Sequence, residues 1–185
     1  MHIAVYSGTF NPLHIGHLAI LRRLVKRFDR VYLVVSPQNP FKDVSGNETG
    51  EARFRAAVEA VARHPELGGK VRVEPIELGM EPPHYTIRTL RALKEREPGN
   101  DFTLVIGADN LESFPRWREH DALLREFGLA VFPRKGFHRG HLKARLLRED
   151  PAYLIELIDA PLVTISSTEI RDALALGKDV SSWLM

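Results

Sequence analysis

The sequence is built from short apolar runs, rich in β-branched residues, that alternate with segments of helical periodicity. The strand-like runs are residues 2–7, 30–36, 70–75, 102–107, 128–132 and 154–158. Apolar residues recur at helical spacing in residues 13–28, 51–64, 86–97, 112–126 and 167–176. Strands that alternate with helices predict an α/β fold, here a Rossmann-like, doubly wound parallel sheet with helices on both faces.

Loops rich in Pro, Gly and polar residues follow several of the predicted strands. The longest are residues 37–50, 80–86 and 132–141. We expect Thr86 to cap the helix that follows the second of these loops. Ligands of such sheets bind beyond the carboxyl ends of the strands, where the strand order reverses. The loops are therefore predicted to converge on one site.

Composition limits the class of protein. The 185 residues carry a net charge of +2 and no cysteine. We expect one domain over residues 1–185, with residues 160–185 forming a small C-terminal helical part. A disulfide framework and a thiolate zinc site are excluded, and no signal peptide or membrane-spanning run is recognised. These features predict a cytoplasmic protein without a membrane or nucleic-acid partner, and they say nothing of its oligomeric state. The basic segment 134–148 is expected to face solvent.

The stretch SGTFNPLHIGH, residues 7–17, places a glycine turn beneath a helix N-terminus. Backbone amides and the helix dipole suit that position to phosphate. His14 and His17 fall on one face of the first helical turn, and Gly16 leaves their approach open. Imidazoles can donate hydrogen bonds to phosphate and can become cationic beside a polyanion. Two surface histidines remain an alternative, whereas a metal pair lacks a third ligand.

The stretch ISSTEIR, residues 165–171, opens the last predicted helix. Ser166 and Glu169 form a capping box, which is a sufficient structural reason for both residues. Ser167, Thr168 and Arg171 add hydroxyls and a guanidinium to the same helix N-terminus, as an anion site requires. Together with the histidine segment, this helix N-terminus could hold a triphosphate.

With these two motifs the sequence resembles the nucleotidyltransferase superfamily that carries H-x-G-H and S-T-x-x-R. Four further segments, SPQNPFKD, PHYTIRTL, IGADNLESFPRW and FPRKG, follow in the order found in bacterial nicotinate-mononucleotide adenylyltransferases. The resemblance extends over nearly all of residues 3–171. It implies a nucleotidyltransferase-type fold, ATP and nicotinate mononucleotide as partners, and Mg²⁺ bound through the ATP phosphates rather than by protein side chains.

The resemblance also implies roles for individual residues. His17 would stabilise the α-phosphate with help from His14, and Arg171 would hold the departing pyrophosphate. The residues expected to contact the substrates or ATP are Gly8, Thr9, Phe10, Asn39, Lys42, Tyr85, Thr86, Gly107, Asp109, Trp117, Arg134, Ser166, Ser167 and Thr168. Within this set, Tyr85, Thr86 and Trp117 would form the pyridine pocket.

Several of these residues also have ordinary structural explanations. Trp117 suits an apolar core, Asp109 a helix cap, Tyr85 a half-buried surface position and Lys42 a solvated loop. Asn11 stands where many bacterial relatives have aspartate, and the chain ends at SSWLM, where relatives continue into a further helix.

The choice of acceptor stays open at this point. Nicotinamide mononucleotide and phosphopantetheine are alternative acceptors for the same transfer. A nucleotide-binding module without turnover is a further alternative.

Overall fold

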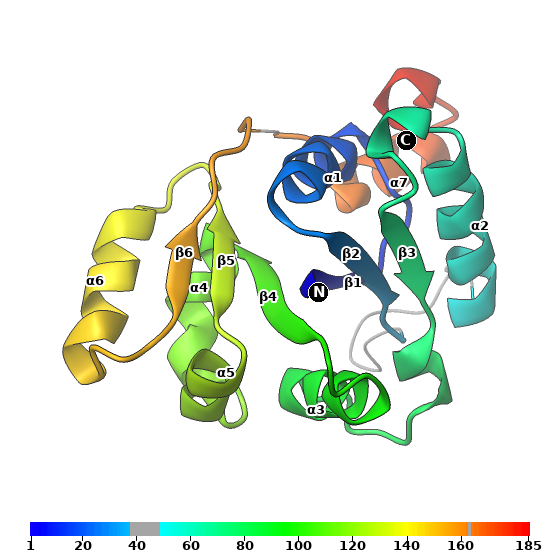
Figure 1. The fold of residues 1–185 in the computed structure, drawn as a ribbon. Coiled ribbons are helices and arrows are strands. Elements are labelled where there is room, and N and C mark those ends of the chain that lie inside the picture. The colour runs from blue at the N-terminus through cyan, green and yellow to red at the C-terminus, as the bar shows by residue number, and fades with distance from the viewer. Residues whose placement is uncertain (38–48, 163) are drawn as a thin grey trace.

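The computed structural model describes residues 1–37, 49–162 and 164–185. Six parallel strands in these residues form one sheet in the order β3-β2-β1-β4-β5-β6 (Figure 1). The strands are β1 (His2–Gly8), β2 (Arg30–Val35), β3 (Val71–Glu74), β4 (Asp101–Gly107), β5 (Leu129–Phe132) and β6 (Ile155–Leu157). Each lies within two residues of a predicted run, so the predicted parallel sheet is confirmed.

The strand order reverses between β1 and β4. From β1 the chain moves outward through β2 to β3, and then crosses back to place β4 on the other side of β1. Gly8 at the end of β1 pairs with Val35 of β2, and Gly107 ends the adjacent β4. The carboxyl ends of β1 and β4 therefore flank a switch point, where α/β sheets bind their ligands.

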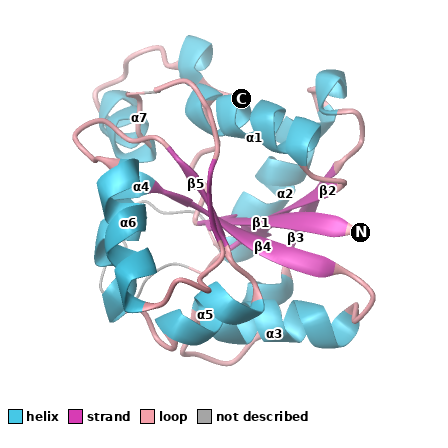
Figure 2. Cartoon of the chain, turned by 60° about the vertical axis from the view of Figure 1, so that its left-hand side comes forward, coloured by secondary structure: helices cyan, strands magenta, loops and turns pink. Residues whose placement is uncertain are grey.

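Helices cover both faces of the sheet. Figure 2 shows α1 and α2 on one side and α3 and α5 on the other. The helices are α1 (Ile15–Arg27), α2 (Gly50–Ala62), α3 (Thr86–Arg96), α4 (Ala108–Ser113), α5 (His120–Glu126), α6 (Arg139–Glu149) and α7 (Ser167–Ala175). None of the helices among the described residues is long and apolar enough to cross a membrane.

The alternation of side chains along each strand explains the two-sided core. In β1, Ala4 and Tyr6 join the cluster under α1 and α2, whereas Ile3 and Val5 join the cluster under α3 to α6. Successive residues of a strand point to opposite faces, so a strand covered on both sides must be apolar throughout. This requirement explains the uninterrupted apolar runs in the sequence.

Three helix boundaries differ from the predicted ones. Tyr85, not Thr86, is the N-cap of α3, because Tyr85 has the extended backbone of a cap and Thr86 is already helical. The predicted helix over 112–126 is two helices, α4 and α5, separated by a 3-10 turn that contains Pro115. The basic loop 132–141 ends at Arg139, where α6 begins. Leu146 is the one buried residue of α6, so the helix lacks the buried apolar stripe from which its start could be predicted.

The end of the chain packs beside the histidine segment. Gly177, with φ of 70°, follows α7 in the left-handed conformation that terminates helices, as its position predicted. A short 3-10 turn (Ser181–Trp183) then leads to Leu184, which forms an antiparallel bridge with His14. Met185 is buried in the core cluster of α1. The last residues thus support the backbone at His14.

Candidate active site

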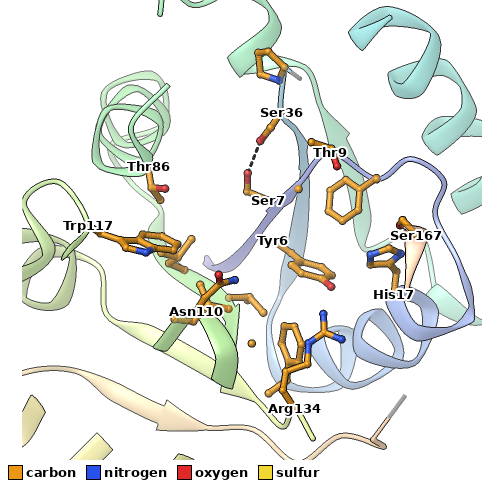
Figure 3. A pocket seen from close by; sticks show the side chains of 18 residues that line it. Tyr6, Ser7, Thr9, His17, Ser36, Thr86, Asn110, Trp117, Arg134 and Ser167 are labelled. Carbon is orange, nitrogen blue, oxygen red and sulfur yellow. Dashed lines mark hydrogen bonds between the residues drawn. The ribbon is translucent and has the colours of Figure 1, made fainter. Parts of the chain in front are cut away.

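A cavity of about 560 Å³ opens at the switch point of the sheet (Figure 3). It lies between the ends of β1 and β4, with α3 on one side and the start of α7 on the other. Its lining is Tyr6, Ser7, Gly8, Thr9, Phe10, His17, Ser36, Pro37, Thr86, Leu104, Val105, Ile106, Gly107, Asn110, Trp117, Phe132, Arg134 and Ser167. Residues that are far apart in the sequence meet here, as the loop convergence predicted.

Many of the residues singled out in the sequence line this cavity. They are Gly8, Thr9, Phe10, His17, Thr86, Gly107, Trp117, Arg134 and Ser167. His14 lines a smaller adjoining cavity together with His17 and Arg134. The structure thus gathers the two histidines and both predicted motif regions around one space, while the role of each residue stays a prediction.

Other predicted residues lie beside the cavity or outside the described chain. Asp109 forms an ion pair with Arg134, whose Nε lies 3.5 Å from Asp109 Oδ1. Tyr85 is 43% exposed and contacts the Arg118 guanidinium with its ring. Asn39 and Lys42 lie within residues 38–48, outside the described residues. Ser166, Thr168 and Arg171 do not line the main cavity. Ser166 is the N-cap of α7, and Thr168 and Arg171 lie in its first turns; the N-terminus of α7 approaches the cavity through Ser167.

Sequence reasoning missed several lining residues at the ends of the strands. Ser7 lies near the end of β1, and Ser36 directly follows the adjacent β2. Their hydroxyl oxygens lie 2.9 Å apart. Tyr6, Pro37 and Asn110 also line the cavity. A signal for the serines was present, because polar residues at the carboxyl ends of two adjacent buried strands must share one edge of the sheet.

His14 and His17 form a capping box at the start of α1. The backbone N–H of Gly16 donates to Nδ1 of His14 at 3.0 Å. The backbone N–H of His14 donates in turn to Nδ1 of His17 at 3.1 Å. Because both Nδ1 atoms are acceptors, a neutral ring must carry its proton on Nε2 in each case. The backbone therefore selects the tautomer in which each ring has an N–H donor on its far side.

Both imidazoles are neutral near pH 7 in this environment. Burial, reinforced by the positive charge of Arg134, lowers the pKa of His14 to about 4. Burial and the neighbouring His14 lower the pKa of His17 well below its usual range. The ring centroids lie 3.7 Å apart, so protonation of one ring disfavours protonation of the other. The pair thus offers hydrogen-bond donors first, and positive charge only where an anion raises these pKa values.

Phe10 turns the chain between β1 and α1. Its φ of 47° lies in the left-handed region that non-glycine residues rarely occupy. The ring of Phe10 folds back over Gly8, where a Cβ atom would approach it to 3.1 Å. Glycine at position 8 therefore leaves room for this ring, which also packs edge-on against His17 with centroids 5.2 Å apart.

Arg53 of α2 fastens two strand ends beneath the cavity. The residue is only 2% exposed. Its Nη1 donates to the carbonyl oxygens of both Thr9 and Ser36. One buried guanidinium thus fixes the loop after β1 relative to the end of β2. Nothing in the helical pattern of α2 distinguishes this arginine from a surface residue.

The first turn of α7 is tied to the same loop. Ser166 and Glu169 form the predicted capping box, with the backbone N–H of Glu169 donating to Ser166 Oγ. Ser167 Oγ donates to the carbonyl oxygen of Pro12, and Arg171 donates to that of Asn11 at 2.7 Å. These contacts set the N-terminus of α7 against the loop that leads into α1.

The crevice lies at the switch point of a parallel sheet and is bordered by two helix N-termini and a pair of imidazoles. This is the architecture of a nucleotidyltransferase-type α/β protein. Comparison with known proteins identifies the family within this class. The model of the cytidylyltransferase-like family matches residues 5–173, and the chain belongs to this family.

Curated relatives match over nearly the whole chain. A protein of Bacteroides fragilis named "probable nicotinate-nucleotide adenylyltransferase" is 38% identical over 182 residues, which are 97% of this chain and 85% of the relative. A protein of Porphyromonas gingivalis with the same name is 36% identical and matches 100% of this chain and 89% of its own length. The family resemblance predicted from the sequence is confirmed.

Solved structures share the fold. The nicotinic acid mononucleotide adenylyltransferase of Plasmodium falciparum, complexed with NaAD, superposes with a TM-score of 0.79 at 20% identity. The superposition covers 99% of this chain and 90% of that chain. The nucleotidyltransferase-type, Rossmann-like fold is thereby confirmed.

Proposed function

We propose that this protein transfers the adenylyl group of ATP to nicotinate mononucleotide, giving nicotinate adenine dinucleotide and pyrophosphate in NAD biosynthesis. The observation that carries the proposal is the capping box of His14 and His17, whose Nε2–H donors lie beside a cavity bordered by the N-termini of α1 and α7. The names of the relatives, which span nearly the whole chain, support the same activity.

The chemistry needs positioning rather than a general base. A phosphate oxygen of the mononucleotide attacks the α-phosphorus of ATP, and the bond from that phosphorus to the bridging oxygen breaks as pyrophosphate leaves. The attacking oxygen is already anionic at neutral pH, so no proton has to be removed. The barrier lies in the repulsion between two polyanions, which oriented donors can relieve.

The described residues can share this task. Nε2–H of His17 would donate to the α-phosphate as negative charge grows there, with His14 assisting. Ser167, Thr168 and Arg171 would hold the pyrophosphate at the N-terminus of α7, where the helix dipole favours negative charge. Gly8, Thr9 and Phe10 would let the backbone approach the phosphates closely.

The acceptor would lie on the opposite side of the cavity. Trp117 and Thr86 both line it, from the turn after α4 and from the first residue of α3. Trp117 could stack on the flat pyridine ring, and the N-terminus of α3 could receive its carboxylate. Tyr85 would border this pocket, Asp109 would bind ribose hydroxyls, and Asn39 and Lys42 would approach from residues 38–48.

A divalent cation, which we take to be Mg²⁺, would enter with the ATP phosphates and neutralise part of their charge. Among the described residues there is no group of three or more His, Asp or Glu side chains that could hold a metal ion. We propose that phosphate oxygens and water carry this cation, and that His14 and His17 act as hydrogen-bond donors. The absence of cysteine suits a reducing compartment, and we place the activity in the cytoplasm.

A turnover assay with ATP and Mg²⁺ tests the proposal. Nicotinate mononucleotide, nicotinamide mononucleotide and phosphopantetheine are offered separately, and pyrophosphate and the adenylylated product are measured by chromatography and mass. We expect strong preference for the nicotinate acceptor. Preference for the amide would retain the mechanism and overturn the acceptor. Folded protein that binds ATP but turns over none of the three would instead be a nucleotide-binding module.

A further inference from the structure

Tyr6 occupies the centre of the cavity wall, and none of the sequence motifs includes it. It lies on β1 two residues before Gly8 and lines both the main cavity and the smaller cavity beside His14. Its ring packs edge-on against Phe10 and Phe132, with centroids 5.5 and 5.8 Å apart. These two rings fix the direction of the phenol, so its hydroxyl has a defined position.

The Tyr6 hydroxyl has no hydrogen-bond partner within the described parts of the chain, although the residue is only 6% exposed. Tyr32, the buried tyrosine on the neighbouring strand β2, differs in this respect. Its hydroxyl donates to Glu97 Oε2 at 2.7 Å. The Tyr6 side chain borders both cavities, so its hydroxyl can be satisfied by a molecule bound there. A ligand in the cavity could supply the missing acceptor.

The groups that face Tyr6 are themselves donors. Figure 3 shows its hydroxyl directed toward the space between the His17 ring and the Arg134 guanidinium. The Tyr6 and His17 ring centroids lie 6.2 Å apart, and His17 carries its ring proton on Nε2. Arg134 cannot accept a hydrogen bond. The Asp109 carboxylate is paired with that arginine.

The phenol stays protonated over the working pH range. Burial raises the pKa of Tyr6 well above its usual value, despite the opposing charge of Arg134. Its hydroxyl therefore remains a donor near neutral pH. Three donors from β1, α1 and the loop after β5 converge on one space, and an anion would satisfy all of them.

We propose that the Tyr6 hydroxyl donates a hydrogen bond to a nonbridging oxygen of the ATP α-phosphate, between His17 and Arg134. This makes Tyr6 a further catalytic residue, and the assignment rests on the adenylyl transfer proposed above. The serines, glycines and helix N-termini of the cavity supply further backbone and side-chain donors, and Tyr6 adds one from β1.

Replacement of Tyr6 by Phe tests the proposal, because it removes one hydroxyl and keeps the ring. Tyr32→Phe is the matched control: it removes a hydroxyl from the adjacent strand, outside the cavity. Three quantities are measured for each protein: kcat/KM for ATP, the Kd of ATP without acceptor, and the midpoint of thermal unfolding. The acceptor KM serves as an internal reference.

We expect Tyr6→Phe to lower kcat/KM for ATP about tenfold or more, since hydrogen bonds to charged groups are among the stronger ones. Its acceptor KM should stay within about twofold, and its unfolding midpoint should be unchanged or higher, because the lost hydroxyl had no partner in the protein. Tyr32→Phe should show the reverse pattern: a lower midpoint, because Glu97 loses its donor, and unchanged kinetics.

Wild-type kinetics and ATP affinity in Tyr6→Phe would overturn the proposal. A loss of activity that accompanies a lower midpoint and disappears on cooling would also overturn it, because packing would then explain the effect. If the wild-type protein binds ATP but turns over no acceptor, adenylyl transfer fails and the Kd of ATP alone decides the role of Tyr6. If it binds no ATP, both proposals fail.

Discussion

The backbone N–H of His14 donates to Nδ1 of His17 across 3.1 Å, so the main chain that starts α1 also orients an imidazole toward the cavity. Nδ1 of His14 is held in the same way by the backbone N–H of Gly16. Tautomer and ring orientation thus depend on the geometry of a helix cap. Such preorganisation places donors before the substrate arrives and avoids reorganisation during the reaction.

Replacing His17 by Ala should impair the chemical step more than ATP binding. Loss of one oriented donor to a developing charge costs about 10²–10³-fold in kcat. We expect kcat to fall in that range, while the Kd of ATP changes by no more than about threefold, since other donors hold the remaining phosphates. Steady-state kinetics and calorimetry measure the two quantities. His141→Ala, on the exposed part of α6, is the control and should retain wild-type kinetics.

The low pKa values of the two histidines predict how stability depends on pH. In the unfolded chain both rings titrate near pH 6.5, whereas burial holds the folded pKa of His14 at about 4 and that of His17 well below its usual range. As the pH falls below about 6.5, the unfolded chain binds protons that the folded protein cannot, so stability is lost toward pH 4.

Thermal unfolding between pH 8 and 4 measures this dependence. His17→Gln keeps an acceptor for the His14 N–H but does not titrate, so its midpoint should fall less steeply below pH 6.5. His141→Gln should follow the wild-type curve. Equal slopes in all three proteins would mean that His17 does not carry the acid sensitivity.

Arg53 should contribute stability through the two carbonyl groups it satisfies. Arg53→Met removes the donor to Thr9 and Ser36 and leaves two carbonyl oxygens without it. We expect the free energy of unfolding to fall by about 2 kcal/mol or more, because each abandoned buried group costs about 1–3 kcal/mol. Urea denaturation gives the value. Arg55→Met, on the exposed side of the same helix, should change it by less than about 0.5 kcal/mol.

A side chain at Gly107 should displace its neighbours. A Cβ atom at this position would collide with the Asp109 carboxylate and approach Phe132 and Arg134 to 3.1 and 3.2 Å. Gly107→Ala should displace Asp109 and Arg134 together and lower kcat/KM by about tenfold to a hundredfold, since small misplacements of substrate-binding groups are costly. Gly99→Ala meets no atom within 4 Å and should leave the kinetics unchanged. Normal activity in Gly107→Ala would mean that the Asp109–Arg134 pair is dispensable.

Trp117 should act on the acceptor and not on ATP. Stacking of an aromatic side chain on a base contributes about 1–3 kcal/mol, so Trp117→Ala should raise the KM of the mononucleotide about tenfold to a hundredfold and leave the KM of ATP nearly unchanged. Trp183, the second tryptophan of the sequence, packs beside α7 and provides the control. An equal rise in both KM values would place Trp117 in the scaffold instead.

The parts of the fold that the sequence predicted are those dictated by local chemistry. The apolar runs located the inner strands β2 and β5 most clearly, because nearly all of their residues are buried and apolar. The capping box of Ser166 and Glu169 could also be predicted, because its two reciprocal hydrogen bonds require a fixed spacing of three residues. Helix α6 was missed at its start because its residues contact solvent along most of its length.

The parts of the site that the sequence did not predict depend on three-dimensional placement. In the sequence Tyr6 looks like one more apolar residue of a strand. Only the alternation of side chains along β1 places it on the face of the sheet that is shared with His17. Arg53 looks like a surface arginine until α2 packs over the strand ends. The Ser7–Ser36 pair requires the register between β1 and β2. In each case the partner residue lies on another helix or strand, so the local sequence pattern does not predict the contact.

The tie between Ser167 and Pro12 has a consequence for biosynthesis. It joins residues separated by 155 positions, and Arg171 reaches back to Asn11 over 160. During translation the histidine segment leaves the ribosome early, yet the helix that completes the nucleotide cleft is still unmade. The nucleotide cleft can therefore be completed only after residue 171 has been synthesised. Substrate binding can assist only the finished polypeptide and not its growing intermediates.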